Sequence, residues 1–305
     1  MTIKTEIPPE KGQRINMIGA WLKNHFGQKV VKLSLDGGFT CPNRDGSKGV
    51  GGCIFCSPDG SGELSTDIPG QIQLLSEKWP NVHRYLAYFQ SHTSTYAPVE
   101  MLEKLYTEAL SYPLNNGEIV GLVIATRPDC LGDDVIALLK KLQQTSFLWV
   151  ELGLQTIYGD NVNRCYPLST YDEAITKLQE AGIPYVTHLI LGLPGETSEQ
   201  MKESVAYVCS QPLFGLKLHL MNVVKGAAMN HLYPNYQPFS SPEEYVSLVC
   251  DLLEIIPPQV TIHRLTGDVP RKLLVSPPWS YKKRTILNGI NHEMARRNSY
   301  QGCKL

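Results

Sequence analysis

FLWVELGLQ, residues 147–155, is the stretch that decides the fold. Its alternate residues form one apolar face, whereas the opposite face carries Glu151 and Gln155. A strand that is buried on both sides is normally apolar throughout. An acid and an amide on one face of an apolar strand therefore indicate the lining of a polar interior, as in an open or incomplete barrel. A strand at the edge of a sheet is the alternative.

Similar strands recur along the chain and alternate with amphipathic segments. In GLKLHLMNVV, residues 215–224, Lys217 and His219 again face away from a row of leucines. Strands that alternate with helices indicate parallel strands joined by right-handed crossovers. We predict an α/β protein with an incomplete TIM-type (β/α)6 barrel of parallel strands and a C-terminal extension. The predicted units are an N-terminal helical extension (1–28), the core barrel (29–230), and a C-terminal α/β extension with a basic segment (231–305).

Three of the eight cysteines lie within CPNRDGSKGVGGCIFC, residues 41–56, directly after the first predicted strand. A structural zinc site needs four ligands, so Cys41, Cys53 and Cys56 would require a histidine such as His83 or His92. An iron–sulfur cluster is held by thiolates, and three of them would leave one iron open to another ligand. Spacing alone leaves both metals open and favours the iron–sulfur cluster.

Polar residues follow several strands, where the active face of such a barrel lies. Arg127 follows the strand 118–126 and offers a donor fork for a carboxylate, although it could instead pair with Asp129 or Asp160. Phe55 lies within the cysteine loop, where its ring could contact the base of a nucleotide cofactor or simply pack. These residues are expected on the same face as the cysteine loop.

The net charge of −1 is unevenly distributed. Residues 257–305 hold nine lysines and arginines against two acids, a local balance of +7, which leaves −8 for the rest of the chain. This suggests either an anionic partner such as nucleic acid or a solvated basic helix. Trp279 or Tyr281 could stack on bases there. No apolar run is long enough to span a bilayer and the N-terminus lacks a signal peptide core, so we expect a cytoplasmic protein.

The words LSLDGGFTCPNRDG, VIATRPDCL, VELGLQT and THLILGLPGET together resemble the radical S-adenosylmethionine (radical SAM) superfamily. Within it they are similar to the YtqA/YhcC-like subgroup, which is related to the radical domain of the Elongator catalytic subunit. The resemblance runs from about Val30 to Met229. It implies that Cys41, Cys53 and Cys56 ligate a 4Fe–4S cluster that binds S-adenosylmethionine at its open iron. Reduction of the cluster would cleave the cofactor to a 5'-deoxyadenosyl radical.

The resemblance also implies cofactor contacts. Gln90 and Ser91 stand where relatives hold the methionine amino group with a Gly-Gly-Glu segment that this chain lacks. Glu151 and Gln155 match positions that contact the ribose or the amino acid part. Gly192 matches a segment beside the adenine, although it could also belong to an ordinary turn capped by Thr197. The predicted cofactor contacts are Phe55, Gln90, Ser91, Glu151, Gln155, Gly192 and Asn222, and the predicted substrate contacts are Arg127, His188, Lys217, His219, Lys282, Lys283 and Arg284.

The function implied by the resemblance is modification of the tRNA wobble uridine. The expected step converts 5-carboxymethylaminomethyluridine to 5-aminomethyluridine. The implied partners are tRNA, a reducing electron donor such as flavodoxin or ferredoxin, and a tRNA methyltransferase. Two alternatives stay open at this point: a radical SAM enzyme that acts on a free metabolite, as coproporphyrinogen oxidases do, and a non-catalytic RNA-binding protein with a zinc loop.

Overall fold

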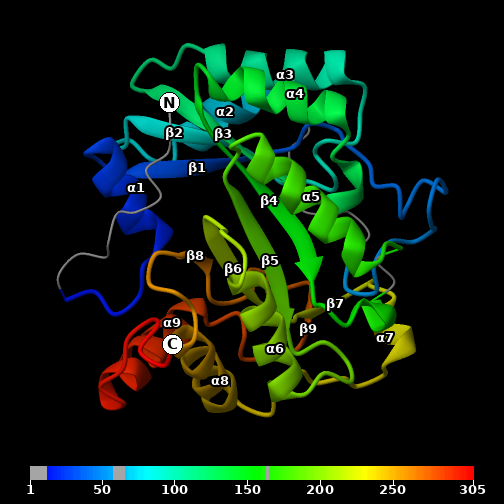
Figure 1. The fold of residues 1–305 in the computed structure, drawn as a ribbon, viewed down its shortest axis with the longest axis vertical. Helices are drawn as coiled ribbons and strands as arrows, with labels where there is room; N and C mark the ends of the chain where they lie inside the picture. The colour runs from blue at the N-terminus through cyan, green and yellow to red at the C-terminus, as the bar shows by residue number, and fades with distance from the viewer. Residues whose placement is uncertain (1–11, 58–65, 163–164) are drawn as a thin grey trace.

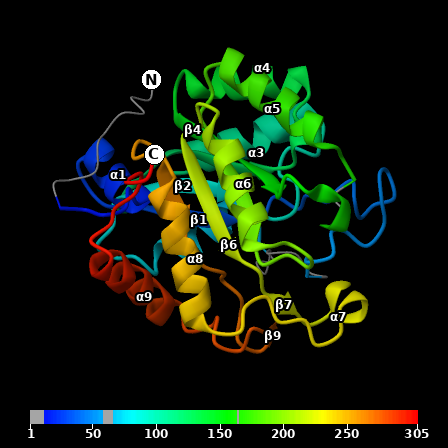
Figure 2. The ribbon, with the colours of Figure 1, turned by 60° about the horizontal axis from the view of Figure 1, so that its bottom comes forward.

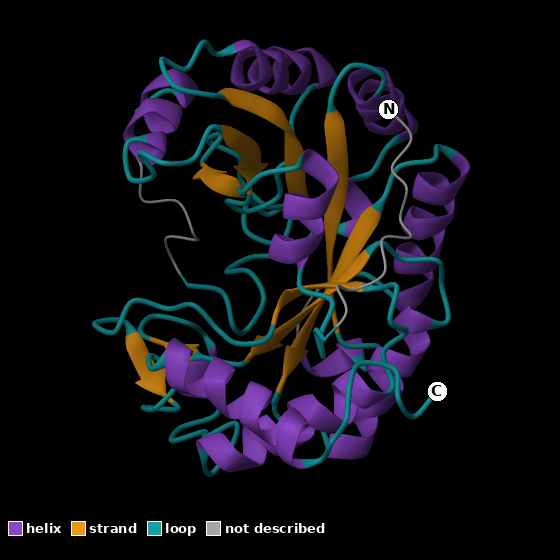
Figure 3. Cartoon of the chain, turned by 90° about the vertical axis from the view of Figure 1, so that its left-hand side faces the viewer, coloured by secondary structure: helices purple, strands orange, loops and turns teal. Residues whose placement is uncertain are grey.

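The segment 147–155 forms the middle strand of a curled parallel sheet. The structure is a computed structural model that describes residues 12–57, 66–162 and 165–305. Its main sheet has seven parallel strands in the order β1-β2-β3-β4-β5-β6-β8, curled into an open half-barrel (Figure 1, Figure 3). The strands are β1 (Val30–Leu35), β2 (Arg84–Phe89), β3 (Glu118–Thr126), β4 (Phe147–Gln155), β5 (Tyr185–Leu191), β6 (Gly215–Leu220) and β8 (Thr261–Arg264).

Helices cover the outer, apolar face of this sheet (Figure 3). Each presents one apolar stripe inward, as α4 does with Leu138, Leu139 and Leu142. Gly182 ends α5 with a φ of 67°, as expected of a C-terminal glycine. In the part of the chain that the structure describes, no helix is long and apolar enough to cross a membrane. These outer helices are α2 (Ile68–Ser76), α3 (Val99–Ser111), α4 (Asp133–Gln143), α5 (Leu168–Glu180) and α6 (Ser198–Cys209).

Helix α1 (Ile18–Phe26) forms an apolar floor beneath the half-barrel. Its Trp21 ring lies 5.9 Å from the ring of Phe147, at the start of β4, and 5.0 Å from that of Phe214, just before β6. The residue before the helix, Met17, forms a parallel bridge with Ile262 of β8. Because α1 packs at the N-terminal strand ends, the opposite ends are left for the cysteine loop.

The C-terminal segment is joined to the core rather than set apart from it. Helices α8 (Pro242–Glu254) and α9 (Lys283–Arg296) pack together (Figure 2), and β8 between them extends the main sheet. The run 215–224 does not stay one strand: β7 (Val223–Val224) turns away to pair antiparallel with β9 (Leu274–Ser276). The short helix α7 (Met229–Leu232) follows β7, and two short 3-10 helices are Pro128–Cys130 and Gly159–Val162.

The predicted fold class is confirmed: an incomplete parallel (β/α) barrel with a C-terminal extension. The predicted (β/α)6 core gains a seventh strand, β8, from the extension. The three unit boundaries stay predictions, and residues 1–11 of the predicted N-terminal extension lie outside the described residues.

Candidate active site

The cysteine loop is shaped by tight turns around its three thiols. The carbonyl of Cys41 accepts hydrogen bonds from the amides of Arg44 (2.8 Å) and Asp45 (3.2 Å), and the amide of Cys56 donates to the carbonyl of Cys53 (3.0 Å). Gly52, which precedes Cys53, has a φ of 83°, a left-handed conformation that favours glycine. The loop is therefore wound into a compact structure by its own backbone.

Polar and cationic side chains surround these sulfurs. Asn43 Nδ2 donates to Cys53 Sγ at 3.5 Å, and Arg127 Nη1 lies 3.9 Å from Cys41 Sγ. A hydrogen bond from the Cys53 thiol lowers the pKa of Cys56 to about 6, and Arg44 adds to this effect against the opposing effect of burial. The thiolate is the form of cysteine that binds iron.

These observations fit the predicted iron–sulfur ligands. Over the described ranges 12–57, 66–162 and 165–305, no group of three or more His, Cys, Asp or Glu side chains is already closed around a metal position. Donors aimed at their sulfurs are what an electron-rich cluster requires.

Arg127 follows β3 and forms the ion pair that we considered as the alternative to carboxylate binding. Its Nε and Nη2 donate to the two oxygens of Asp129 at 2.9 and 2.8 Å. The guanidinium also lies over the ring of Tyr166, 5.1 Å from its centroid. Lys48 Nζ binds the same Asp129 at 2.8 Å, so this pair fastens the cysteine loop to the end of β3.

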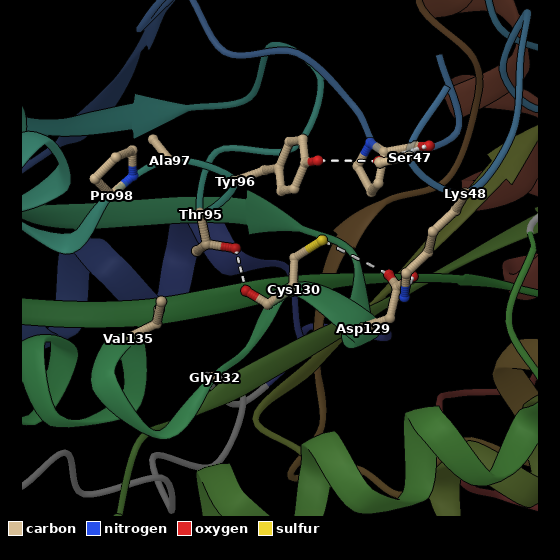
Figure 4. A pocket seen from close by; sticks show the side chains of 11 residues that line it. Ser47, Lys48, Thr95, Tyr96, Ala97, Pro98, Asp129, Cys130, Gly132 and Val135 are labelled. Atoms are coloured by element: carbon tan, nitrogen blue, oxygen red, sulfur yellow. Dashed lines mark hydrogen bonds and ion pairs between the residues drawn. The ribbon is translucent and has the colours of Figure 1, made fainter. Parts of the chain in front are cut away.

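A cavity of about 560 Å³ lies between the cysteine loop and the starts of α3 and α4 (Figure 4). Tyr96 Oη lies 3.0 Å from Ser47 Oγ, and Cys130 Sγ lies 3.8 Å from Asp129 Oδ1. None of the three predicted iron ligands lines this cavity. The lining residues are Pro42, Ser47, Lys48, Thr95, Tyr96, Ala97, Pro98, Asp129, Cys130, Gly132 and Val135.

Inside the half-barrel, polar side chains from six strands meet in a group that we name the interior polar cluster. At its centre Glu151 accepts hydrogen bonds from Lys217 and from Tyr88 Oη (2.6 Å), and Lys32 Nζ lies 3.5 Å away. Burial would raise the pKa of Glu151, but Lys217 and Lys32 hold it well below its usual value. The cluster comprises Lys32, Tyr88, Glu151, His188, Lys217, His219, His263 and Arg264.

Three neutral histidines complete this cluster. The rings of His188 and His219 are 5.2 Å apart, and Arg264 Nη1 lies 3.2 Å from His219 Nδ1. His263 Nε2 lies 2.9 Å from Thr261 Oγ1. Burial, helped by Lys217 and Arg264, lowers the pKa of His188 to about 3, and burial also lowers the pKa of His219 and of His263 well below the usual value. The sequence places Glu151, Lys217 and His219 on the interior face, where the structure has them.

Other predicted cofactor contacts lie around the upper strand ends. Phe55 packs against an apolar cluster that includes Ile54 and Met229, which supports the packing alternative. Gln90 and Ser91 follow β2, where Gln90 is half-buried and Ser91 is buried. The Oε1 atom of Gln155 is buried without a hydrogen-bond partner among the described residues.

Gly192 and Asn222 both have structural reasons to be where they are. Gly192 has a φ of 87°, and a Cβ there would lie 2.6 Å from the ring of Phe239. Thr197 and Gln200 form a capping box at the start of α6, as in an ordinary strand-to-helix turn. Asn222 is buried and its Oδ1 accepts from Ser280 Oγ at 2.6 Å. Neither observation decides a cofactor contact, so both stay predictions.

The basic segment lies on the outer surface around the start of α9. Lys282 and Arg284 are exposed, and Lys283 Nζ pairs with Asp268 Oδ2 at 2.8 Å. Arg271 lies over the ring of Tyr281, 4.6 Å from its centroid, and this ring is 39% exposed. Trp279 instead packs against the core, so of the two aromatics only Tyr281 is exposed for stacking.

Sequence reasoning missed two members of the interior polar cluster, Lys32 and Tyr88, whereas His263 and Arg264 stand among the polar residues expected at strand ends. Lys32 and Tyr88 alternate with apolar neighbours, and this alternation was the available signal. Arg264 ends β8, beyond a register shift between Leu216 and Lys217 of β6 that the sequence does not reveal.

Comparisons with known proteins identify the family. The model of the radical SAM superfamily matches residues 41–208, and that of the radical SAM C-terminal domain matches residues 214–296. The chain is 43% identical over 302 residues to the uncharacterized protein YtqA of Bacillus subtilis, covering 95% of this chain and 92% of that protein. It is 26% identical over 282 residues to the tRNA uridine(34) acetyltransferase of Methanocaldococcus jannaschii, covering 74% of this chain and 50% of that protein.

A solved structure shares the fold. Elp3 from the archaeon Methanocaldococcus infernus matches 89% of this chain and 64% of its own with a TM-score of 0.67 at 18% identity. The family model replaces the non-catalytic zinc-protein alternative, because it covers the cysteine loop and most of the barrel. The chain belongs to the radical SAM superfamily, whose cofactors are a 4Fe–4S cluster and S-adenosylmethionine.

Proposed function

We propose that this radical SAM enzyme modifies the wobble uridine of tRNA, converting 5-carboxymethylaminomethyluridine to 5-aminomethyluridine. The cluster and S-adenosylmethionine, when bound, supply reductive cleavage of the sulfonium and an adenosyl radical able to attack an unactivated C–H bond. The protein's own part is to hold the cluster, to orient the substrate and to exclude water from the barrel. We place this activity in the cytoplasm, with flavodoxin or ferredoxin as electron donor and a tRNA methyltransferase as a further partner.

Cys41, Cys53 and Cys56 are the residues that would hold the cluster. The observation that supports this assignment is the set of donors aimed at their sulfurs, from Asn43 and Arg127. The loop also follows β1, so it lies at the strand ends where the active sites of such barrels are found.

The tRNA part of the proposal is carried by the likeness to a protein named for its action on uridine 34 of tRNA. The exposed basic segment supports it, because phosphate contacts from lysine and arginine supply most of the affinity for RNA. Tyr281, which lies close to Arg271 and Lys282 and is partly exposed, offers a ring on which a base can stack.

The direct test of the substrate is genetic. We expect that deleting the gene makes 5-carboxymethylaminomethyluridine accumulate at the wobble position, at the expense of 5-aminomethyluridine and the nucleosides made from it. Mass spectrometry of tRNA nucleosides measures both. A deletion strain with the same nucleoside profile as the parent contradicts the tRNA assignment and leaves a free metabolite as the substrate.

The test of the cluster uses a matched pair of cysteine variants. After anaerobic reconstitution with iron and sulfide, Cys56→Ala should lose the cluster's absorbance and release no 5'-deoxyadenosine on reduction. Cys303→Ala, which removes a thiol far from the loop in sequence, should behave as the wild type. Equal iron content and equal 5'-deoxyadenosine release in the two variants would contradict the ligand assignment.

A further inference from the structure

The interior polar cluster holds more positive charge than it can neutralise. It contains three basic side chains, Lys32, Lys217 and Arg264, and a single carboxylate, Glu151. Burial lowers the pKa of Lys217 to about 7, and Lys32 and Arg264 alone already outnumber the acid. The three histidines add no charge of either sign, because their lowered pKa values keep them neutral. Charge removed from water is costly unless it is paired. The cluster is therefore short of negative charge.

Glu151 has no capacity left for Arg264. Its Oε2 is bound by Lys217 and by Tyr88 Oη. Its Oε1 receives Lys32 Nζ at 3.5 Å and Trp149 Nε1 at 3.3 Å. The acid and Lys217 are 2% and 5% exposed at their side chains, so this part of the cluster is closed off.

Arg264 is placed differently. It is the last residue of β8, only partly buried, and its one polar partner in the described part of the chain is His219 Nδ1 at 3.2 Å. A guanidinium has five N–H donors arranged as a fork, so most of them are left for another acceptor. Next to His219, the Nε2 atom of His188 is buried and has no hydrogen-bond partner among the residues that the structure describes.

We propose that Arg264, together with His219 and His188, binds the carboxylate of the substrate inside the barrel. A carboxylate matches the guanidinium fork with two parallel hydrogen bonds and supplies the missing negative charge. The identity of that carboxylate rests on the proposed function: the carboxymethyl group of the modified uridine is the part of the substrate that carries one.

This site would also separate substrate from product. The product, 5-aminomethyluridine, has lost the carboxylate and keeps the amine, which is protonated at neutral pH in both nucleosides. Without the carboxylate the product brings only positive charge to this basic site, so the same charges select the substrate and favour release of the product.

The test compares two free nucleosides as probes of the reconstituted enzyme. We expect 5-carboxymethylaminomethyluridine to raise the Tm of the wild type and 5-aminomethyluridine to leave it unchanged. Arg264→Gln should weaken binding of the first nucleoside by about 10- to 150-fold, the range for losing a charged hydrogen-bond partner. Arg264→Lys, which keeps the charge without the fork, should lie between the two. Arg296→Gln, which removes an exposed arginine on α9, is the matched control.

Three outcomes would overturn the inference. They are equal binding of the two nucleosides by the wild type, equal binding of the first nucleoside by wild type and Arg264→Gln, and a loss of S-adenosylmethionine binding in Arg264→Gln, which would assign Arg264 to the cofactor. An altered tRNA profile in the deletion strain beside any of these results would leave the proposed function standing. An unchanged profile would instead remove the proposed function, whatever Arg264 does.

Discussion

Two groups of basic side chains in the described part of the chain lack a paired acid, one inside the barrel and one on the outer surface, and they differ in their exposure to water. Inside the barrel, Arg264 sits among groups from several strands and meets a single polar partner in the described chain. Outside, Arg271, Lys272, Lys282 and Arg284 are exposed around the start of α9 and form no ion pair within the described residues. Desolvated, fixed charges select a ligand by geometry, whereas exposed charges bind phosphate with little sequence preference.

The two ends of α9 sharpen this contrast. At its C-terminal end Arg297 binds Asp251 (2.6 Å) and Glu293 (2.7 Å), and Arg296 binds Glu293 as well. Arg297 therefore joins α9 to α8, whereas Arg296 pairs within α9. Among the described residues around α9, the basic side chains without an ion pair lie in its first turn and the loop before it, so the outer site is smaller than the +7 balance of the whole segment suggests.

The largest effect is expected from breaking the interior pair. Glu151→Gln leaves Lys217 buried without its carboxylate and should lower the free energy of unfolding by about 3–5 kcal/mol. Asp268→Asn removes the acid of the exposed pair with Lys283 and should cost less than about 1 kcal/mol. Urea denaturation at neutral pH measures both. Similar losses in the two variants would mean that the interior pair is as well solvated as the outer one.

Acid should reduce the stability contributed by the interior polar cluster and leave the contribution of the exposed basic segment unchanged. The pKa of His263 is lowered by burial, with Lys32 adding to the effect, so below pH 6.5 the unfolded chain takes up a proton that the folded chain refuses. Stability is therefore full above pH 6.5 and falls as the pH drops, by about 1.4 kcal/mol per pH unit for each such group. His263→Asn should reduce this slope between pH 6.5 and 5, above the range in which Glu151 adds its own loss.

Urea unfolding at pH 6.5, 5.75 and 5 gives the slope directly. His292→Asn is the control, because His292 lies exposed on α9 and should leave the slope as in the wild type. The slope is the readout, since any buried substitution also lowers the absolute stability. Equal slopes in wild type and His263→Asn would show that His263 titrates in the folded protein much as it does in the unfolded chain.

The sequence predicts a feature well when the feature depends on neighbouring residues, and poorly when it depends on residues that are far apart along the chain. The alternation in residues 147–155 was enough to predict a polar interior, because a strand's two faces are fixed by its own residues. That Glu151 meets Tyr88 and Lys217 depends on the curl of the sheet, which brings β2, β4 and β6 together. No local pattern encodes that pairing.

The cysteine loop is an example of a feature that depends on neighbouring residues, and Gly192 is an example of one that depends on a distant residue. The spacing of the three cysteines favours an iron–sulfur cluster over zinc because the number of close ligands is local information. The close packing of Gly192 comes from Phe239, far along the chain, and so was invisible beside the simpler explanation of a turn. In the sequence Arg127 could bind a substrate carboxylate or pair with Asp129 or Asp160, and the structure shows the pair with Asp129.

The outer basic segment should affect RNA affinity and not stability. Replacing both Lys282 and Arg284 with glutamate should reduce tRNA affinity by about tenfold or more at low salt and lower the slope of log K against log salt by roughly 2, about one for each lost phosphate contact. Unfolding free energies should stay within about 0.5 kcal/mol of the wild type. Filter binding over a salt series tests this. Undiminished, salt-independent binding would move the RNA surface elsewhere.

A small effect on stability is expected at Arg264 itself, and its sign carries the information. Removing a partner from a satisfied buried pair destabilises a protein, as expected for Glu151→Gln. Removing a charge that lacks its counter-ion relieves repulsion from Lys217 and Lys32, so Arg264→Gln should leave the ligand-free protein as stable as the wild type or more stable by up to about 1 kcal/mol. Urea denaturation of the two proteins without added nucleoside measures the difference.

A loss of 3 kcal/mol or more would mean that Arg264 already has its partner in the folded chain, which would leave no vacant position for a substrate carboxylate. If Arg264→Gln instead raises the free energy of unfolding and also binds the nucleoside more weakly, Arg264 serves ligand binding at the expense of stability.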